Sequence, residues 1–408
     1  MKNVAVIGAG ASGLMAAYAA AINGNRVTVF EKNEKCGKKI YITGKGRCNL
    51  THECSPDEFL QNVVSNAKFL TGAIYNFSPQ RTKDFFEDGG LRLKTERGDR
   101  VFPVSDKASD VTKCLEKYCL NAGVQFKFGE NVLKISYLDS TMFDIITSKG
   151  TQTADSVIVC TGGLSYPLTG STGDGYKFAE EAGHKIVEQK PSLCGVNLKG
   201  DYFKKLQGLT LKNVKLRVFI NNSPKHEFFG EMLFTHFGVS GPIVLSASSF
   251  INRCDLKSVK LSLDFKPALT EEQLDARILR DFDKYKNKDI ANCLKELLPS
   301  ALIPIILKRC GIPQTKKINS VTRNERQSLL TTIKNFDMLV SSLRGFDEAI
   351  VTAGGVDVRE INPKTMESKL VKGLYFCGEV LDIDALTGGF NLQIAFSTGF
   401  AAGNSIKE

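Results

Sequence analysis

The sequence predicts an α/β protein in which a domain built on a parallel sheet is split in two by a long insertion. Three observations indicate this fold. An apolar strand, a glycine-rich turn and a helix open the chain, a second apolar strand ends in a glycine turn near residue 160, and a third strand, turn and helix close the chain. Continuous apolar strands suit a parallel sheet that is buried on both faces. The insertion reads as a β-rich module that carries a small helical subdomain.

Composition is ordinary for a globular chain of several domains. The 408 residues carry a formal charge of +10, and their Lys and Arg residues are scattered without the run that marks a nucleic-acid arm. We therefore expect no DNA partner, although an anionic substrate or cofactor would suit the surface. Eleven cysteines without a CxxC pair predict a reducing compartment, hence the cytoplasm, and four scattered histidines predict no metal site. The oligomeric state stays open.

The stretch from Val4 to Ile22 has no charge and is long enough to raise the question of a membrane span. Three glycines interrupt it near its start, and Asn23-Gly24-Asn25 ends it. A buried strand, a turn and a helix explain these features, so no membrane span is expected. A signal peptide is also disfavoured, because no cleavage site of small residues follows a charged start.

The opening segment has the layout of a dinucleotide-binding βαβ unit. Gly8, Gly10 and Gly13 match GxGxxG, in which the first glycine allows a tight turn, the second admits a pyrophosphate and the third lets helix and strand pack closely. The following helix, expected from Leu14 to Ile22, presents N–H groups at its N-terminus to phosphate, and Ala11 and Ser12 just before it are further expected cofactor contacts. Glu31 ends the second strand, where a carboxylate binds the adenosine ribose.

This unit fits either NAD or FAD, and the segment after Glu31 favours FAD. A simple nicotinamide-binding domain would continue with a helix and a third strand, whereas here a basic, glycine-punctuated loop follows. Its cations can neutralise phosphate, its glycines permit close backbone approach, and such loops in two-dinucleotide-fold flavoproteins run under the flavin. The loop residues expected at the cofactor are Lys32, Lys38, Lys39, Gly46, Arg47, Cys48 and Asn49.

A second strand with a glycine turn lies at Val157–Cys160, followed by Thr161, Gly162 and Gly163. Such a turn passes beside the nucleotide in flavoproteins. The alternating segment before it is typical of a β-meander between the two halves of an FAD domain, and Val132 in that segment is a further expected cofactor contact.

The closing segment repeats the opening arrangement. A strand at Leu374–Cys377 leads through a loop and two glycines into an apolar helix that begins near Asn391. Reduced flavin is anionic near N1 and C2=O, and a helix N-terminus stabilises that charge. Because NAD has no such anionic ring, this second helix argues for FAD. The contacts expected here are Gly378, Glu379, Asp384, Gly389, Asn391, Leu392 and Gln393.

These segments define the predicted domains. The FAD-binding domain comprises residues 1–190 and 346–408, and the insertion comprises a β-rich part at 191–269, a helical subdomain at 270–315 and a return at 316–345. No second strand–GxGxxG–helix unit is present in the insertion. NAD(P)H, if it is the electron donor, is therefore expected to visit the flavin transiently.

Several long motifs together resemble one bacterial family of FAD-dependent oxidoreductases. The motifs are "TGKGRCNLT", "TGGLSYPLTGSTGDGY", "GEMLFTHFGVSGP", "VTAGGVDVREINPKTMESK" and "GLYFCGEVLDIDALTGGFNLQIAFSTG". The family includes aminoacetone oxidases and 3-dehydro-bile acid Δ4,6-reductases. The resemblance implies a split Rossmann-like FAD domain, a β-barrel-like insert, a small helical domain and non-covalent FAD.

Two residues are candidates for catalysis. His236, in a glycine-rich loop, either donates a proton over the flavin or is a structural loop residue, and Tyr166 either protonates a carbon or orients a carbonyl. Cys48 lacks a CxxxxC partner, so a small residue packed at the flavin is favoured over a redox disulfide. Glu379 and Asp384 are expected to bind the ribityl chain or waters linked to phosphate rather than to act as bases.

Three functions remain open at this point. The favoured one is NAD(P)H-dependent reduction of a C=C bond conjugated to a ketone, with a small substrate of the bile acid or steroid enone type. The second is oxidation of an amine such as aminoacetone with oxygen as acceptor. The third is a non-catalytic or RNA-associated flavoprotein, which the charge of +10 permits but which the absence of a basic and aromatic stripe in the sequence disfavours.

Overall fold

The computed structural model, which describes residues 1–137 and 142–407, contains a parallel sheet of five strands from both ends of the chain. Its order is β19-β10-β1-β2-β6, so the opening strand lies at the centre between two buried neighbours. The apolar runs form these strands because a central parallel strand is covered on both faces. The strands are β1 (Asn3–Ile7), β2 (Arg26–Glu31), β6 (Gln125–Phe128), β10 (Ser156–Val159) and β19 (Leu374–Phe376).

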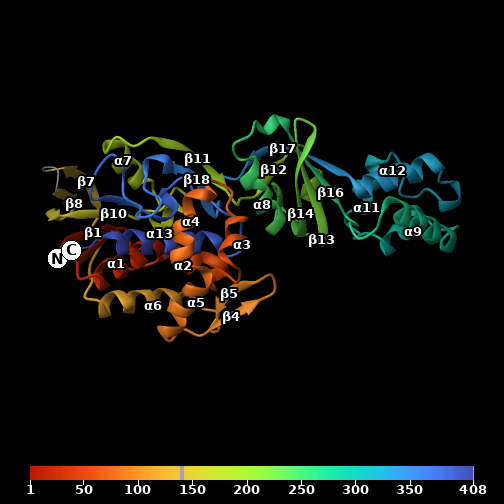
Figure 1. Cartoon of the computed structure of the whole chain (residues 1–408). Coiled ribbons are helices and arrows are strands. Elements are labelled where there is room, and N and C mark those ends of the chain that lie inside the picture. Colours follow the sequence, from red (N-terminus) through yellow and green to blue (C-terminus); the bar gives the residue numbers. More distant parts are fainter. Residues whose placement is uncertain (138–141, 408) are drawn as a thin grey trace. The chain divides into compact units, whose positions relative to one another are not determined.

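The chain divides into two units, each with its own core. Unit 1 comprises Met1–Ser192 and Phe346–Glu408, and unit 2 comprises Leu193–Gly345 (Figure 1). The predicted fold class, a Rossmann-type sheet domain interrupted by an insertion, is therefore confirmed.

Helices α1 (Ala11–Ile22) and α13 (Phe390–Ser405) pack tightly together in unit 1 (Figure 1). A Cβ atom on Gly399 would lie 2.3 Å from the Ser12 carbonyl oxygen, and one on Gly403 would lie 2.2 Å from that of Ala16. Both helices advance by four residues between these contacts, so they run parallel. Since α13 starts about eight residues further from the contact, its N-terminus precedes that of α1 by about 12 Å at 1.5 Å per residue.

The remaining elements of unit 1 surround this sheet and helix pair. A three-stranded meander precedes β10, as predicted, and its residues 138–141 lie outside the described residues. The meander is β7 (Val132–Tyr137), β8 (Phe143–Thr147) and β9 (Gly150–Ala154); a small sheet is β3 (Thr51–His52), β4 (Leu93–Glu96) and β5 (Arg100–Pro103); a two-stranded sheet is β11 (Ile186–Ser192) and β18 (Val351–Val356). The other helices are α2 (Lys38–Ile42), α3 (Pro56–Leu60), α4 (Ala67–Asn76), α5 (Pro79–Asp88), α6 (Ala108–Asn121) and α7 (Asp174–Glu181).

Unit 2 contains a closed six-stranded barrel in the order β12-β15-β14-β13-β16-β17. Its longest hairpin turns at Asn221 and Asn222, which both have positive φ as a tight two-residue turn requires. The strands are β12 (Val196–Leu198), β13 (Thr210–Ile220), β14 (Ser223–Phe234), β15 (Gly238–Ser240), β16 (Val259–Asp264) and β17 (Phe336–Leu343).

The helical part of unit 2 extends further than the sequence predicts. Helix α12 (Arg323–Lys334) packs against the helices before it, so the helical subdomain does not end at residue 315. A capping box formed by Thr322 and Glu325 starts this amphipathic helix after the prolines that end the earlier helices, so the helical pattern continues beyond residue 315. The other helices of unit 2 are α8 (Pro242–Ile251), α9 (Glu271–Lys284), α10 (Ile290–Cys293) and α11 (Ile303–Arg309).

The two units differ sharply in charge. Unit 1 has 29 Lys and Arg against 30 Asp and Glu, whereas unit 2 has 25 Lys and Arg against 14 Asp and Glu. The whole positive excess of the chain therefore belongs to the insertion.

The uncharged stretch Val4–Ile22 forms β1, the turn and α1. Across the described residues, none of the helices combines the length and the apolar character that a membrane crossing requires.

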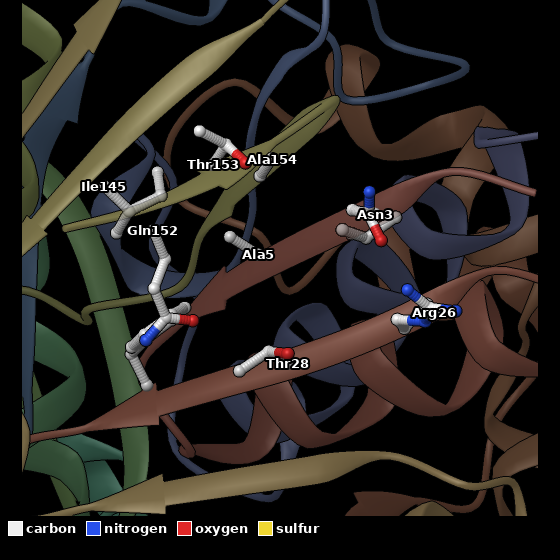
Figure 2. A pocket seen from close by; sticks show the side chains of 10 residues that line it. Asn3, Ala5, Arg26, Thr28, Ile145, Gln152, Thr153 and Ala154 are labelled. Carbon is white, nitrogen blue, oxygen red and sulfur yellow. The ribbon is translucent and has the colours of Figure 1, made fainter.

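A cavity of about 170 Å³ lies where β1 and β2 meet β8 and β9. Figure 2 shows Asn3, Arg26, Thr28 and Gln152 among the side chains that line it. It borders Asn3, Val4 and Ala5, before the glycine-rich turn that follows β1, so we do not assign it to the predicted cofactor site.

Candidate FAD site

The three glycines after β1 have different tasks. Gly8 has φ of 99°, and a Cβ atom there would lie 2.7 Å from the Cys160 carbonyl oxygen, while one on Gly13 would lie 1.9 Å from that of Gly8. These two glycines are required by the packing of the protein itself. A Cβ atom on Gly10 would meet nothing within 4 Å, so Gly10 borders open space. This cradle, which a side chain would fill, fits a pyrophosphate.

The start of α1 faces that space. Gly10 caps the helix without a side-chain hydrogen bond, and the first helical bond runs from the Leu14 N–H to the Gly10 carbonyl. The N–H groups of Ala11, Ser12 and Gly13 precede that bond and carry the positive end of the helix dipole. An anion is the ligand that this terminus suits.

Glu31 is nearly buried at the end of β2. One carboxylate oxygen accepts from the Ala9 N–H at 2.8 Å, and the other accepts from the Asn33 N–H at 2.8 Å and from the Asn33 side-chain amide at 2.7 Å. Two such oxygens offer about four acceptor positions, so about one remains for a ribose hydroxyl. Val132 begins β7 two residues after Glu130, whose N–H bonds the Glu31 carbonyl, which brings the meander to the predicted ribose end.

The start of α13 is built around Gly389, whose φ is 98°. A Cβ atom there would lie 2.5 Å from the Thr51 carbonyl carbon and oxygen, so only glycine fits. Asn391 holds the preceding loop, because its side chain accepts from the Ala385 N–H at 3.0 Å and donates to the Ala385 carbonyl at 2.8 Å. The first-turn N–H groups, including that of the half-buried Leu392, are left to face a ligand.

Gln393 and Asp384, two predicted cofactor contacts, have side chains that are bonded within unit 1. The Gln393 side chain is fully buried and bonds Thr51 and the Phe77 carbonyl. The Asp384 carboxylate is fully buried and accepts from Ser65 at 2.6 Å and from Ser192 at 2.9 Å. A cofactor contact through the backbone of the first turn of α13 stays the prediction for Gln393.

Four cations of the loop after Glu31, Lys32, Lys38, Lys39 and Arg47, are paired within the chain. Lys32 contacts Asp174 at 2.7 Å and Lys38 contacts Glu34 at 3.0 Å. Arg47 binds Glu96 and Asp106 and stacks on the Phe102 ring. That Lys38, Lys39 and Arg47 neutralise phosphate stays a prediction, and each of these three cations already has a carboxylate partner. Helix N-termini are a further source of positive potential.

Lys39 and Glu379 form the centre of a network that sequence reasoning did not foresee. Their side chains lie 2.6 Å apart, and Glu379 also accepts from the Ser165 hydroxyl at 2.7 Å and from the Thr352 N–H at 2.9 Å. Ser165 and Thr352 lie inside two of the motifs that carry the family resemblance, and this was the one indication in the sequence that they belong to the site. The network joins four segments of unit 1 that are far apart in the sequence.

Gly162, Gly163 and Gly378 allow these segments to meet. Gly162 and Gly378 have positive φ, and a Cβ atom on Gly163 would lie 2.5 Å from the Thr352 hydroxyl. One on Gly378 would lie 2.5 Å from that of Ser12. Glycine is therefore needed at these positions because a larger residue would clash with the neighbouring segments.

Four buried polar side-chain atoms of unit 1 lack a hydrogen-bond partner among the described residues. They are the Asn49 oxygen and the hydroxyls of Thr82, Thr161 and Tyr176. A buried polar atom without a partner is costly, so each is expected to bond a ligand or a water. Asn49 and Thr161 are also predicted cofactor contacts, and together with the space at Gly10 they fit a dinucleotide cofactor.

Cys48 follows Gly46 and Arg47 in the same loop and has φ of 60°. Its thiol is buried, and burial raises its pKa to about 12. A neutral thiol is a poor nucleophile, which fits the packing role expected for Cys48.

The two catalytic candidates lie in different units. Tyr166, in unit 1, has a left-handed backbone with φ of 54°, and its N–H donates to the Phe346 carbonyl at 3.0 Å. Burial raises the pKa of this phenol, which stays a proton donor at neutral pH. His236, in unit 2, is exposed on the turn that the Thr235 N–H closes onto the Gly238 carbonyl. The other predicted site residues all belong to unit 1.

The fold and this site define the class of protein. A parallel sheet with a glycine-rich turn at Gly8–Gly13, an acidic residue at the end of β2 and a second glycine-capped helix make a Rossmann-type FAD domain. The chain has the fold of an FAD-dependent oxidoreductase.

Sequence comparison places the chain in a family. Residues 2–405 match the family described as HI0933-like protein Rossmann domain, and the chain belongs to it. The chain is 32% identical over 412 residues to the 3-dehydro-bile acid delta(4,6)-reductase of Clostridium scindens, with 100% of both proteins aligned. It is 29% identical over 404 residues to the ribosomal RNA dihydrouridine synthase of Escherichia coli, with 98% of this chain and 97% of that protein aligned. The family resemblance read from the motifs is confirmed.

Solved structures share the fold. The 3-ketosteroid-delta4-(5alpha)-dehydrogenase from Rhodococcus jostii RHA1 aligns with a TM-score of 0.54 at 15% identity, covering 99% of this chain and 96% of that one. A flavocytochrome c3 fumarate reductase aligns with a TM-score of 0.51 at 17% identity, covering 99% and 77%. At these identities the likeness concerns the fold alone.

Proposed function

We propose that this protein is an FAD-dependent reductase that saturates a C=C bond conjugated to a carbonyl. The observation that carries the proposal is the pair of parallel helices α1 and α13, whose free N-termini are offset by about 12 Å along their axes. One suits a pyrophosphate and the other suits the anionic end of a reduced ring. Gly10 leaves the space between protein and phosphate open.

The named activities of two relatives support the reaction type. A delta(4,6)-reductase of a 3-oxo steroid and a dihydrouridine synthase both add two hydrogens across a C=C bond beside a carbonyl. In both reactions hydride goes to the β-carbon, a proton goes to the α-carbon, and negative charge develops on the carbonyl oxygen. A site of this kind needs hydrogen-bond donors for that oxygen and an acid for the carbon.

In this proposal FAD supplies the hydride transfer. The residues that we assign to hold it are the backbone of Ala11–Gly13, the Glu31 carboxylate, and the Asn49 and Thr161 side chains. The Lys39–Glu379 pair keeps the loop after β2 against the turn after β19. Tyr166 and His236 are the candidate acids, because each carries a proton donor on a constrained turn.

NAD(P)H is the proposed electron donor. A tight nicotinamide complex needs its own pyrophosphate cradle and ribose acid, and the sequence has one full fingerprint, which we assign to FAD. Nicotinamide should therefore bind weakly and leave before the organic substrate enters. Steady-state kinetics with parallel double-reciprocal lines would support this order, and intersecting lines with an isolable NADH complex would contradict it.

Two substrate classes fit the reaction. The first is a steroid-type 3-oxo enone, by analogy with the Clostridium relative. The second is a uracil ring in RNA, which is favoured by the excess of positive charge in unit 2 and by the name of the Escherichia relative. Oxidation of an amine by oxygen is the rival reaction.

Anaerobic stopped-flow spectroscopy tests the proposal. NADH or NADPH should bleach the flavin absorbance, and a steroidal 4-en-3-one or a uridine-containing RNA should restore it without oxygen. If aminoacetone alone bleaches the flavin and air restores it with release of peroxide, the protein is an oxidase and the proposal is wrong.

A further inference from the structure

We infer that His52 is a positioning residue for the reaction, which holds the turn before α13 and adds a positive charge there when its ring is protonated. The inference rests on the proposed function, since it names a residue that sets how readily bound FAD accepts hydride. His52 is the second residue of β3 and directly follows the motif TGKGRCNLT, which ends at Thr51.

Strand β3 holds the residues that lead into α13. The His52 Nδ1–H donates to the Gly388 carbonyl at 3.1 Å, because a carbonyl oxygen can only accept. The His52 ring stacks on the Phe390 ring with centroids 4.6 Å apart. The Thr51 backbone lies so close to Gly389 that a Cβ atom there would clash. These contacts fix the turn whose following N–H groups we assign to the flavin.

The second ring nitrogen of His52, Nε2, is available for a proton. Because Nδ1 carries the hydrogen that Gly388 accepts, Nε2 of the neutral ring has a lone pair, and it becomes an N–H donor when the ring is charged. Nε2 has no hydrogen-bond partner among the residues that the structure describes, and the side chain is half-buried. The ring can therefore gain a proton without losing its bond to Gly388.

The charged groups around His52 act on its ring in opposite directions. Glu58 on α3, which accepts from the Ser55 N–H at 2.8 Å, favours a charged ring. Arg100 lies opposite His52 on β5 and disfavours it. Helix α13 has no charged side chain, and Lys83 of α5 pairs with Glu53 at 2.7 Å. The other charged residues of the packed helices are Asp57 on α3 and Arg81, Asp84, Glu87 and Asp88 on α5.

A new negative charge at the start of α13 would favour the protonated ring. Hydride brings two electrons and one proton to a flavin, which leaves one negative charge near N1 and C2=O. The first turn of α13 meets that charge with N–H groups, and a protonated His52 at the same cap adds a full positive charge. The proton enters from solvent at Nε2 on reduction and returns to solvent when the substrate takes the electrons. His52 should therefore favour reduced FAD at low pH, and should lose this effect at high pH.

The reduction potential of the bound FAD tests this in the flavin-loaded protein. It is measured by equilibration with a reference dye at pH 6 and pH 8.5, in the wild type and in His52→Asn, whose amide keeps a donor for Gly388 but cannot be charged. At pH 6 the preference of the variant for reduced over oxidised FAD should fall about tenfold, which lowers the potential of a two-electron couple by about 30 mV. At pH 8.5 the two proteins should agree within about twofold. His52→Gln, a second variant without the charge, should behave in the same way.

The matched control is His226→Asn in unit 2. His226 is also a half-buried histidine on a phenylalanine ring, with its centroid 4.2 Å from that of Phe250. This variant should keep the wild-type potential within about twofold at both pH values. An equal shift in the control, a shift of the same size at both pH values, or no shift at pH 6 in either His52 variant would each overturn the inference.

The dye measurement needs neither NADPH nor an enone, which separates this inference from the proposed function. If the wild type reduces no enone with NADPH, the reductase is wrong, and a pH-dependent shift in the His52 variants still supports the role of His52. A wild type that reduces an enone while the His52 variants keep its potential overturns this inference alone. A wild type that takes up no FAD overturns both.

Discussion

The two units of this chain handle charge in opposite ways. Unit 1, with 29 basic and 30 acidic residues, pairs the loop cations nearest its candidate site, as Lys39 with Glu379 shows. Unit 2, with 25 basic and 14 acidic residues, carries the whole positive excess of the chain. A cofactor site can use helix N-termini and backbone N–H groups, which need no net charge. A surface for a transient polyanion needs exposed cations, because their attraction is long-ranged and reversible.

Gly10→Val is expected to have the largest effect, the complete loss of bound flavin. The added side chain would occupy open space that the pyrophosphate needs, so the protein should purify colourless. Its apoprotein should melt within about a degree of wild-type apoprotein, because nothing in the chain is displaced. Flavin absorbance and differential scanning fluorimetry measure both quantities.

Gly345→Val is the matched control, since a Cβ atom there also meets nothing within 4 Å. This variant should keep its flavin. Normal flavin content in Gly10→Val would contradict the assignment of the opening turn.

His236→Asn should leave FAD bound and slow substrate turnover about a hundredfold, if this exposed histidine is the general acid. This variant sharpens the comparison of the two units, because it tests whether a residue of unit 2 takes part in the reaction. The half-reaction with NADPH should be unchanged. Unchanged turnover would assign His236 to the structure of its turn.

Gly13→Ala should destabilise unit 1 by roughly 1–3 kcal/mol through overpacking. Its Cβ atom would lie 1.9 Å from the Gly8 carbonyl oxygen, so the helix and turn must separate. Chemical denaturation of the apoprotein measures this loss. A stability equal to that of Gly10→Ala would show that the two glycines do not differ as the packing indicates.

His184→Gln should produce the smallest effect, a weaker dependence of stability on pH. The His184 ring is buried between Glu360 and Ser368, and burial lowers its pKa although Glu360 opposes this. The unfolded chain therefore binds the proton more readily, and wild-type stability should fall as pH drops below about 6.5. The variant should lose less melting temperature than the wild type between pH 7 and pH 5, as differential scanning fluorimetry at the two pH values measures.

The glycine-rich turn after β1 and the helix that closes the chain could be predicted from the sequence, because glycine spacing and apolar runs are local signals. Side-chain partners were not readable, because Gln393 and Asp384 turn inward to residues more than 190 positions away.

The central claim is that one elongated dinucleotide spans the N-termini of α1 and α13. The flavin released by denaturing the purified protein tests this most directly, by chromatography against FAD and FMN standards with quantification per chain. The account predicts about one FAD per chain, either as purified or after reconstitution. A protein that takes up FMN alone, or that stays colourless after incubation with FAD, would contradict it.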